Sequence, residues 1–479
     1  MNYSYEPAPF VTAMAEFEAK RLAPLHTPGH KQGQGAHSLL TEIITETGLK
    51  RDVSVADALD DLAEPTHCLK KAQELVAHLY GAKAAYFSVN GTTGALHIML
   101  MAALNPGDKV LVARNIHRAV LGALVLVGAN PVFIQPTVDS EFGIAGSLSV
   151  DAVAKAVKAN PMAKGLVVTS PTYYGETADL AAIGRLLHEH DMLLMVDEAH
   201  GAHLAFSPKL PPDAITSGAD LAAQSTHKLL GALTQCSWLL AGSNRVTAER
   251  LRKANMLLCT TSPNNLLLAS LDIARLQMEE CGEELVGRAV NLALDLRDKI
   301  DGTNGLKVFR PTQGDITKIT VSVRELGISG FTAAEILRSE YKIEPELADA
   351  YNILFLLTYA DDGKICDKIY TSLKDMAAKY YPAHKFTLET DVPPPASQRM
   401  SLRDAFFAPA VPCRIEEAVG RIAAEQIMFY PPGIPVIFPG EEITRAAVDF
   451  LCVGLHDGGK IVGAADLSLK TLRVVDDNS

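Results

Sequence analysis

Short apolar runs alternate with stretches of helical spacing between about residue 70 and residue 280 of the chain. Runs that are apolar almost throughout are typical of strands buried on both faces of a parallel sheet. The helical stretch 179–190 is representative, and we expect Thr177 or Asp179 to cap its amino end. This alternation predicts an α/β fold with a mostly parallel sheet that helices cover on both faces. The predicted strands are 84–89, 109–113, 131–135, 165–170, 192–197, 221–225 and 237–241.

The pattern changes in the second half of the chain, after a long helix expected over 265–296. Segment 383–399 contains VPPPAS, which is typical of a linker, and the YPPGIP and FPGEE turns beyond it indicate a further domain. Between the long helix and this linker, we expect strands at 306–309, 316–323 and 352–360 and helices at 332–341 and 364–380. We therefore predict an N-terminal arm at 1–55, a large domain at 56–280, a small α+β domain at 281–385 and a C-terminal α+β domain at 386–479.

Composition narrows the class of protein. Apolar residues make up 48% and charged residues 21% of the chain, which is ordinary globular composition. The net charge is −12 and no Lys/Arg-rich block is present, so a nucleic-acid partner is not expected. The seven cysteines are scattered without a C-x-x-C pair, which favours free thiols in a reducing cytoplasm. No signal peptide and no apolar run of about 18 residues is found, so we predict a cytoplasmic protein without a membrane span.

A lysine follows one of the predicted strands directly. The sequence STHK ends at Lys228, just past strand 221–225. Parallel α/β sheets bind their ligands at the carboxyl ends of the strands. The hydroxyl of Ser225 and the imidazole of His227 beside it are both able to bind an anion. Taken alone, Lys228 fits a surface lysine in a loop at least as well.

A glycine-containing turn follows the first predicted strand of the large domain. The sequence VNGTTG at 89–94 opens a helix, where free backbone N–H groups and the hydroxyls of Thr92 and Thr93 suit a phosphate. The turn lacks both the G-x-G-x-x-G and the G-x-x-x-x-G-K-[ST] patterns, which disfavours nucleotide binding. A plain turn with a threonine cap is the alternative.

An acid ends the apolar strand 192–197. Asp197 could pair with a buried cation such as a protonated pyridine nitrogen, which would make that ring an electron sink. Alternatively, Asp197, His200 and His203 could be metal ligands, or Asp197 could hold Mg²⁺ as a Walker-B acid would, although the P-loop is missing. His117 also follows a strand, and its flat ring could lie against a cofactor or belong to an ordinary loop.

Together these motifs resemble those of the bacterial-type Orn/Lys/Arg decarboxylases, which are fold-type I (aminotransferase-like) enzymes that use pyridoxal 5'-phosphate (PLP). The resemblance covers nearly the whole chain, and the pairing of STHK with DEAHGAH is specific. The matching segments are TPGHKQG (27–33), LDDL (59–62), AQEL (72–75), VNGTTG (89–94), ARNIHRAV (113–120), SPTYYGE (170–176), VDEAHGAH (196–203), STHKLLGALTQ (225–235), LLLASLDIAR (266–275), AFFAP (405–409), YPPGIP (430–435) and PGE (439–441).

The resemblance implies how the cofactor is held. Lys228 would carry it covalently, Asp197 would pair with its ring nitrogen, His117 would stack on the ring, and Ala199 would pack on the opposite face. No metal ion is implied. The phosphate would be held by Thr93, Gly94, Ser225 and His227, with Thr92 close by.

The resemblance also implies a reaction. A basic L-amino acid would lose CO₂ to give the corresponding amine, with arginine as the first candidate and lysine or ornithine next, in polyamine biosynthesis. His200 would line the substrate pocket and could, like Lys228, return the proton to Cα. Glu346 would bind the distal cation of the substrate, and Asp349 is a weaker candidate for that task.

Two other functions remain open at this stage. An aminotransferase or eliminating lyase would share Lys228 and Asp197 but would normally grip the α-carboxylate with an arginine, such as Arg399 or Arg403. A catalytically silent regulator on the same fold is the second. By the same resemblance the protein is expected to be a homodimer or a dimer of dimers with shared active sites, and 26–34 is either an arm that reaches the neighbouring subunit or an ordinary loop.

Overall fold

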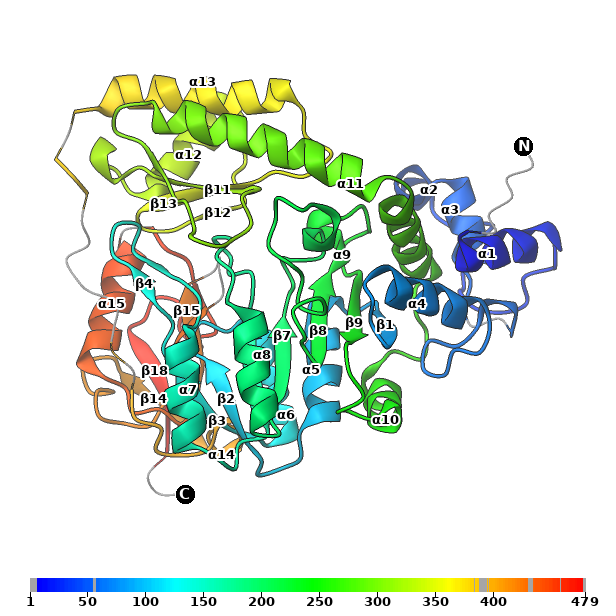
Figure 1. Ribbon diagram of the computed structural model, residues 1–479, viewed down its shortest axis with the longest axis horizontal. Helices are drawn as coiled ribbons and strands as arrows, with labels where there is room; N and C mark the ends of the chain where they lie inside the picture. Colours follow the sequence, from blue (N-terminus) through cyan, green and yellow to red (C-terminus); the bar gives the residue numbers. More distant parts are fainter. Residues whose placement is uncertain are drawn as a thin grey trace.

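The computed structural model describes residues 7–54, 57–382, 384–386, 394, 396–429, 434–456 and 458–476. Its largest element is a seven-stranded sheet in the order β1-β9-β8-β7-β6-β2-β3 (Figure 1). The strands are β1 (Ala84–Ser88), β2 (Lys109–Ala113), β3 (Asn130–Ile134), β6 (Gly165–Thr169), β7 (Leu193–Asp197), β8 (Leu221–Ser225) and β9 (Ser237–Ala241). Only β9 runs antiparallel to its neighbours, so the predicted mostly parallel sheet is confirmed.

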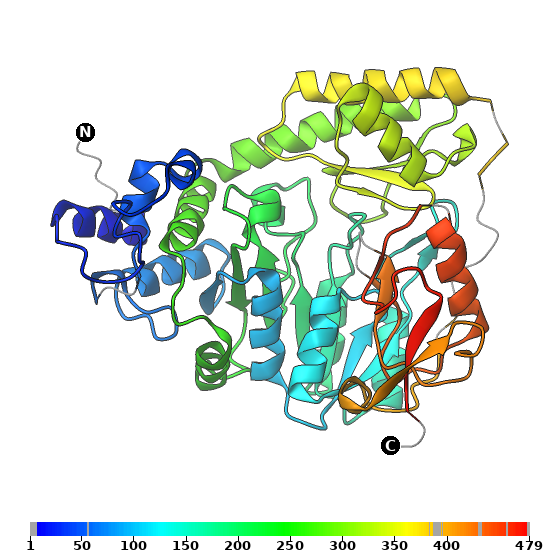
Figure 2. The same ribbon diagram turned by 180° about the vertical axis from the view of Figure 1, so that it is seen from behind.

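Helices cover both faces of this sheet. In Figure 1, α7 and α8 lie in front of it, whereas α5 and α6 lie on the face seen in Figure 2. The central strands are therefore buried on both sides, and Val110, Leu111 and Val112 are all fully buried. Of the two residues predicted to cap α8, Asp179 does so: it accepts a hydrogen bond from the backbone N–H of Ala182 at 2.9 Å. The helices of the large domain are α4 (Cys68–Leu79), α5 (Gly91–Ala103), α6 (Arg118–Val127), α7 (Val150–Ala159), α8 (Leu180–Glu189), η2 (Leu204–Phe206), α9 (Thr226–Leu229) and α10 (Ala248–Leu258).

The N-terminal helices lie at one end of the large domain, against α4 and α11 (Figures 1 and 2). A buried carboxylate attaches them, because Asp272 of α11 accepts from the backbone N–H of Phe10 at 2.9 Å. Arg275 donates hydrogen bonds to Asp272 and to the carbonyl of Pro7. The buried ion pair therefore bonds backbone groups at the start of α1. The elements here are α1 (Pro9–Ala19), α2 (Ser38–Ile44), α3 (Glu46–Arg51) and η1 (Asp57–Leu59).

A long helix, α11 (Asn265–Asp301), connects the large domain to a second core. It departs from helical geometry at Cys281, where φ is −147°, and continues past the predicted end at residue 296. The second core packs this helix against a four-stranded antiparallel sheet in the order β10-β11-β13-β12. Its elements are β10 (Lys307–Val308), β11 (Lys318–Ser322), η3 (Arg324–Leu326), α12 (Gly330–Tyr341), β12 (Leu347–Ala348), β13 (Asn352–Leu356) and α13 (Gly363–Tyr380).

A third core forms in the C-terminal part of the chain, beside the β2–β3 edge of the large sheet (Figure 2). Much of the predicted linker 383–399, and residues 430–433 of the YPPGIP motif, lie outside the described residues. None of the helices that the structure describes is long and apolar enough to cross a membrane. The elements of this part are α14 (Leu402–Phe407), β14 (Ala410–Arg414), β15 (Ile427–Phe429), β16 (Ile434–Ile437), α15 (Arg445–His456), β17 (Ile461–Val462) and β18 (Thr471–Val475). Separately, β4 (Val138–Asp139) and β5 (Ile144–Ala145) form a hairpin between β3 and α7.

Candidate active site

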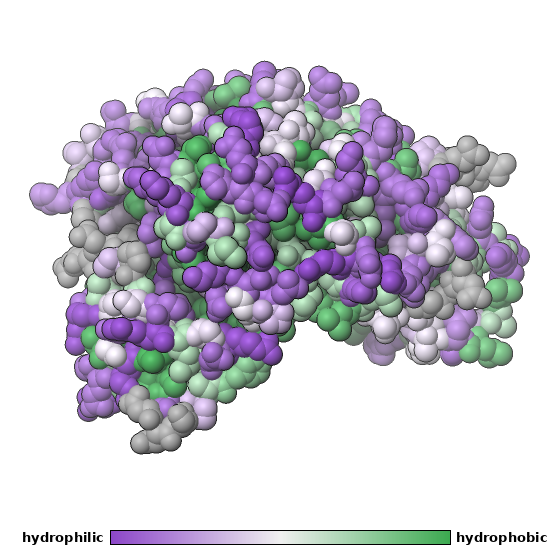
Figure 3. All heavy atoms as spheres, turned by 60° about the horizontal axis from the view of Figure 1, so that its bottom comes forward, coloured by the Kyte–Doolittle hydropathy of each residue, from purple (hydrophilic) through white to green (hydrophobic). Residues whose placement is uncertain are grey.

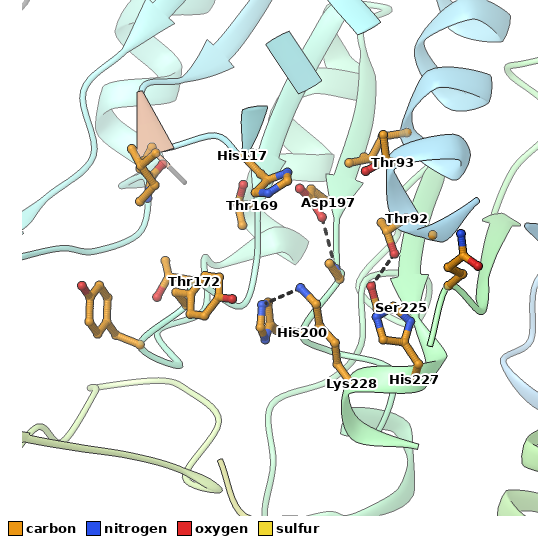
Figure 4. Close-up of a pocket in the computed structure, with 18 of the residues that line it drawn as sticks. Thr92, Thr93, His117, Thr169, Thr172, Asp197, His200, Ser225, His227 and Lys228 are labelled. Carbon is orange, nitrogen blue, oxygen red and sulfur yellow. Dashed lines mark hydrogen bonds between the residues drawn. The ribbon is translucent and has the colours of Figure 1, made fainter. Parts of the chain in front are cut away.

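A cavity of about 350 Å³ lies at the carboxyl ends of the parallel strands (Figure 4). Thr169, Asp197 and Ser225 line it from the last positions of β6, β7 and β8. His117 comes from the loop after β2, and Lys228 from the short helix after β8. The cavity is therefore where a parallel α/β sheet places its ligand, and it brings together side chains that are far apart in the sequence.

One end of the cavity is built to hold an anion. Helix α5 begins there, after Gly91 takes a left-handed φ of 64° that turns the chain out of the strand. Thr92 Oγ1 lies 2.5 Å from Ser225 Oγ and 2.9 Å from Ser237 Oγ, which links the helix start to β8 and β9. Free N–H groups at a helix start and convergent hydroxyls are a phosphate site. His227, also a cavity residue, is oriented by a 2.8 Å hydrogen bond from Nδ1 to the carbonyl of Cys236.

A buried acid lines the same cavity. Asp197 is 2% exposed, and burial raises its pKa, although the cation of Lys228 and the N–H of Ala199 oppose that shift. The Ala199 N–H donates to Asp197 Oδ1 at 3.2 Å (Figure 4). A carboxylate removed from water in this way is stabilised by a cation that enters the cavity beside it.

The imidazole of His117 lines the same part of the cavity as Asp197 (Figure 4). Its Nδ1 accepts from the backbone N–H of Ala119 at 3.2 Å, so the residue also caps α6 and its orientation is fixed. Burial, aided by the nearby cations of Lys228 and Arg118, lowers the pKa of His117 to about 4. A neutral, fixed ring is what stacking on an aromatic ligand requires.

Lys228 and His200 are in direct contact, with Nζ 2.9 Å from Nε2 (Figure 4). On the other side of the same ring, Nδ1 of His200 lies 2.8 Å from Nζ of Lys318, a residue of β11. The ring of Tyr173 packs on His200 with 4.4 Å between centroids. Lys318 was not predicted to belong to the site. Its only sequence signal is a charged residue inside an otherwise apolar strand, and its contact with His200 spans 118 positions.

The two predicted substrate acids have different surroundings. Glu346 Oε1 accepts from the hydroxyl of Tyr173, a cavity residue, at 3.3 Å, and Glu346 itself is exposed. Asp349 accepts from the hydroxyl of Tyr174 at 2.7 Å and from the backbone N–H groups of Tyr351 and Asn352. Glu346 is thus open to a ligand, whereas the oxygens of Asp349 are already used within the protein.

The alternative of a metal site has no support in the described residues, where no three His, Cys, Asp or Glu side chains gather closely enough to hold an ion. His203 instead pairs with Asp315, Nε2 to Oδ2, at 3.2 Å. The two arginines considered for α-carboxylate binding are engaged elsewhere: Arg399 pairs with Glu442 at 2.7 Å, and Arg403 donates to the carbonyls of Val125 and Leu126.

These side chains fit the PLP expected from the sequence. The anion site would take its phosphate, Asp197 its ring nitrogen, and Lys228 its aldehyde. One polar atom supports the fit independently. The Oγ1 of Thr169 is buried at the cavity wall without a hydrogen-bond partner among the described residues, and Thr169 lies opposite Asp197 in the sheet register. Buried hydroxyls are normally paired, so a polar group of a bound ligand is the expected partner.

Comparisons with known proteins show the family of the chain. A family model described as the major domain of Orn/Lys/Arg decarboxylases matches residues 8–321, and the model for the C-terminal domain of the same family matches residues 394–458. The chain is similar to the arginine decarboxylase of Bacillus anthracis (39% identical, covering 98% of this chain and 97% of that protein) and to that of Halalkalibacterium halodurans (40% identical, 98% of each).

Solved structures show the same fold. The lysine decarboxylase of Francisella novicida superimposes with a TM-score of 0.85 over 98% of this chain and 81% of that one, at 24% identity. An alanine–glyoxylate aminotransferase from Nostoc superimposes with a TM-score of 0.54 at 19% identity, covering 74% of this chain and 97% of that one. The large domain therefore has the predicted fold-type I architecture.

Proposed function

The chain belongs to the Orn/Lys/Arg decarboxylase family, and from that premise we propose that it decarboxylates arginine, with lysine or ornithine as weaker substrates. Membership makes it a PLP-dependent carboxy-lyase that acts on a basic amino acid. The choice of arginine rests on relatives named arginine decarboxylase at about 40% identity over nearly the full length. The observation that carries the proposal is the cavity itself, where Lys228 and Asp197 lie together and Glu346 lies beyond Tyr173.

In this proposal, different residues of the chain bind different parts of the cofactor. Thr92, Thr93 and Gly94 at the start of α5, with Ser225 and His227, hold the phosphate. His117 and Ala199 both line the cavity, and they would pack on opposite faces of the ring. Bound PLP supplies an electron sink for the electron pair left when CO₂ departs. The buried carboxylate of Asp197 keeps the ring nitrogen protonated, which is what that sink requires.

Lys228 and His200 are the candidates for returning the proton to Cα. Lys228 would hold the aldehyde of the cofactor through its Nζ. The 2.9 Å contact between Nζ and His200 Nε2 keeps both nitrogens at the cavity, where either can return a proton to Cα. His200 is buried and Lys228 is partly buried, which favours delivery of the proton by the protein over delivery by solvent.

Glu346 selects the substrate in this proposal. A carboxylate beyond Tyr173 would pair with a cation at the far end of a basic side chain, and a guanidinium can use both oxygens at once. Asp349 is less suited, because four donors of the protein already bond its carboxylate. Transamination is not favoured, since Arg399 and Arg403 are held away from the cavity by their own partners.

We further propose that the protein acts as a homodimer or a dimer of dimers, in the cytoplasm and in polyamine biosynthesis. The support for assembly is the N-terminal arm, where Leu25 is 92% exposed and Ile43 is 76% exposed. Apolar side chains reach the surface at that end of the molecule, on the right of Figure 3. Patches of this kind mark contact sites between proteins. Sedimentation equilibrium tests the assembly, and a monomer at micromolar concentration contradicts it.

The test of the function is a CO₂-release panel with arginine, lysine and ornithine. The purified protein is expected to be yellow with PLP and to release CO₂ fastest from arginine. Lys228→Ala is expected to abolish both the yellow absorbance and the CO₂. Protein that stays colourless in excess PLP contradicts the cofactor assignment. Coloured protein that makes keto acids without CO₂ contradicts decarboxylation alone, and a preference for lysine contradicts only the choice of arginine.

A further inference from the structure

Two neighbouring tyrosines connect the loop after β6 to strand β12, which lies outside the large sheet. The hydroxyl of Tyr173 donates to Oε1 of Glu346, just before β12. The hydroxyl of Tyr174 donates to Oδ2 of Asp349, just after β12. The reaction described above uses neither hydroxyl, and the surroundings of the two contacts indicate different tasks.

The contact of Tyr174 is structural. Its side chain is buried, and its hydroxyl lies 2.7 Å from Asp349, which is the length of a strong hydrogen bond. Asp349 also accepts from the backbone N–H groups of Tyr351 and Asn352. This well-bonded carboxylate already attaches the loop after β6 to β12, so the loop does not depend on Tyr173 for its position.

Tyr173 instead lines the cavity and is only partly buried. Its hydroxyl lies 3.3 Å from Glu346 Oε1, which is longer than a strong hydroxyl–carboxylate bond. No other donor among the described residues bonds this carboxylate. A single weak donor orients Glu346 and leaves most of its lone pairs open to a ligand.

Orientation matters because Glu346 is exposed. Without a donor, its flexible side chain would sample several rotamers, and a ligand would have to select one of them. Its charge also reaches the reacting end of the site: burial lowers the pKa of Lys228, and the anions of Asp197 and Glu346 oppose that shift. Glu346 is thus close enough to the cavity to hold the far end of a ligand bound there.

The ring of Tyr173 makes a second contact. It packs on the imidazole of His200, with 4.4 Å between centroids and 55° between planes. The Nζ of Lys228 lies 5.6 Å from the centroid of the same ring. One side chain therefore contacts both the acid at the far end of the proposed substrate site and the imidazole at its reacting end.

We propose that Tyr173 is a positioning residue for both ends of the substrate, because its hydroxyl orients Glu346 toward a guanidinium and its ring holds His200 beside Lys228. A guanidinium is a planar fork that needs a carboxylate in one orientation, whereas an ammonium is a point charge. Orienting Glu346 therefore favours arginine over lysine. The inference rests on the proposed function, because the ligand is its substrate.

Tyr173→Phe tests the hydroxyl, since it removes the donor and keeps the ring. The KM for arginine is expected to rise about 3- to 10-fold, while the kcat stays within about twofold. The KM for lysine, or its inhibition constant against arginine, is expected to change less than about twofold. CO₂ release by the PLP-loaded protein measures these values. Equal factors for the two amino acids, or an unchanged KM for arginine, overturn the proposal.

The same substitution in a Glu346→Ala background separates a direct effect from a general disturbance. With no carboxylate left to orient, Tyr173→Phe is expected to change the KM for arginine by less than about twofold. A factor as large as in the unaltered background overturns the proposal. Tyr341→Phe is the matched control, because its hydroxyl donates to Asp375 at the surface and it does not line the cavity. Its KM and kcat are expected to be unchanged.

Tyr173→Leu tests the ring. It keeps an apolar side chain but removes the flat face that packs on His200, so the kcat for arginine is expected to fall about 10-fold or more. Tyr174 still attaches the loop in this variant, so the fold is expected to be kept. A kcat equal to that of Tyr173→Phe overturns the role of the ring. Unaltered protein that releases no CO₂ from any basic amino acid contradicts the proposed function instead.

Discussion

At the scale of residues, the positions of Lys228, Asp197 and His117 could be predicted and that of Lys318 could not. Lys228, Asp197 and His117 each follow a strand, so the order of strands already places them at one edge of the sheet. Lys318 reaches the same point from β11, outside the large sheet, and no local pattern encodes a contact over that separation. A lysine within a strand usually indicates an exposed position, whereas here it is fully buried.

The role of Glu346 is tested at this scale by Glu346→Gln. The substitution keeps the size and removes the charge, so the KM for arginine is expected to rise about 10- to 100-fold, because a hydrogen bond to a charged group is worth about 1.5 to 3 kcal/mol. The kcat should change little, because the distal cation is bound equally in the ground and transition states. Glu344→Gln is the control, since Glu344 pairs with Arg338 at the surface. Equal KM values for both variants would remove Glu346 from substrate binding.

At the scale of elements, the strands of the large sheet agree with the prediction to within a residue or so, because most of them are apolar runs with turn residues at both ends. The direction of β9 was not predicted. Apolar runs do not encode direction, and the short connection from β8 lets the chain turn straight back instead of crossing over. The break in α11 at Cys281 was also missed. Gly282 beside it packs against the ring of Phe206, a contact that local periodicity cannot show.

Helix α11 is attached to the small-domain sheet by a buried arginine. Arg297 donates to the carbonyls of Phe309, Ile316 and Lys318 at 2.6, 2.9 and 2.5 Å. Arg297→Met leaves these buried acceptors without a donor and is expected to lower the free energy of unfolding by about 3 kcal/mol.

Urea titration measures this loss, and Arg288→Met on the exposed side of the same helix is the control. Arg288 makes one surface hydrogen bond, to the carbonyl of Tyr359, so its loss should cost less than about 1 kcal/mol. A similar, small effect of both substitutions would show that the helix and the sheet are held together by apolar packing alone.

At the scale of the whole molecule, the C-terminal domain is attached to the large domain next to the active site. Arg114, at the end of β2, pairs with the buried Glu441 at 3.0 Å and lies 3.7 Å over the ring of Phe438. Burial lowers the pKa of Arg114 to about 10, with Glu441 opposing, so the arginine remains charged at neutral pH. The same domain supplies Ile434 to the wall of the cavity. Attachment of the domain and the shape of the site are thus coupled.

Glu441→Ala is expected to destabilise the protein by about 3 to 5 kcal/mol, because it leaves the charge of Arg114 buried without a partner. Thermal unfolding with PLP measures this. Glu442→Ala is the matched control, since the neighbouring Glu442 pairs with Arg399 at the surface, where an ion pair is worth about 1 kcal/mol or less. Equal melting temperatures for the two variants would show that the ion pair of Arg114 does not hold the domains together.

The sheet order has a consequence for synthesis of the chain. Strand β1 is the first strand made, yet its partner in the sheet is β9, with Ala84 opposite Ala241. The N-terminal helix likewise depends on Asp272. The chain must therefore be made past residue 241 before β1 can pair, and past residue 272 before the N-terminal helix can be attached. Until β9 has been made, β1 has no partner strand, so the nascent polypeptide exposes a segment that chaperones can bind.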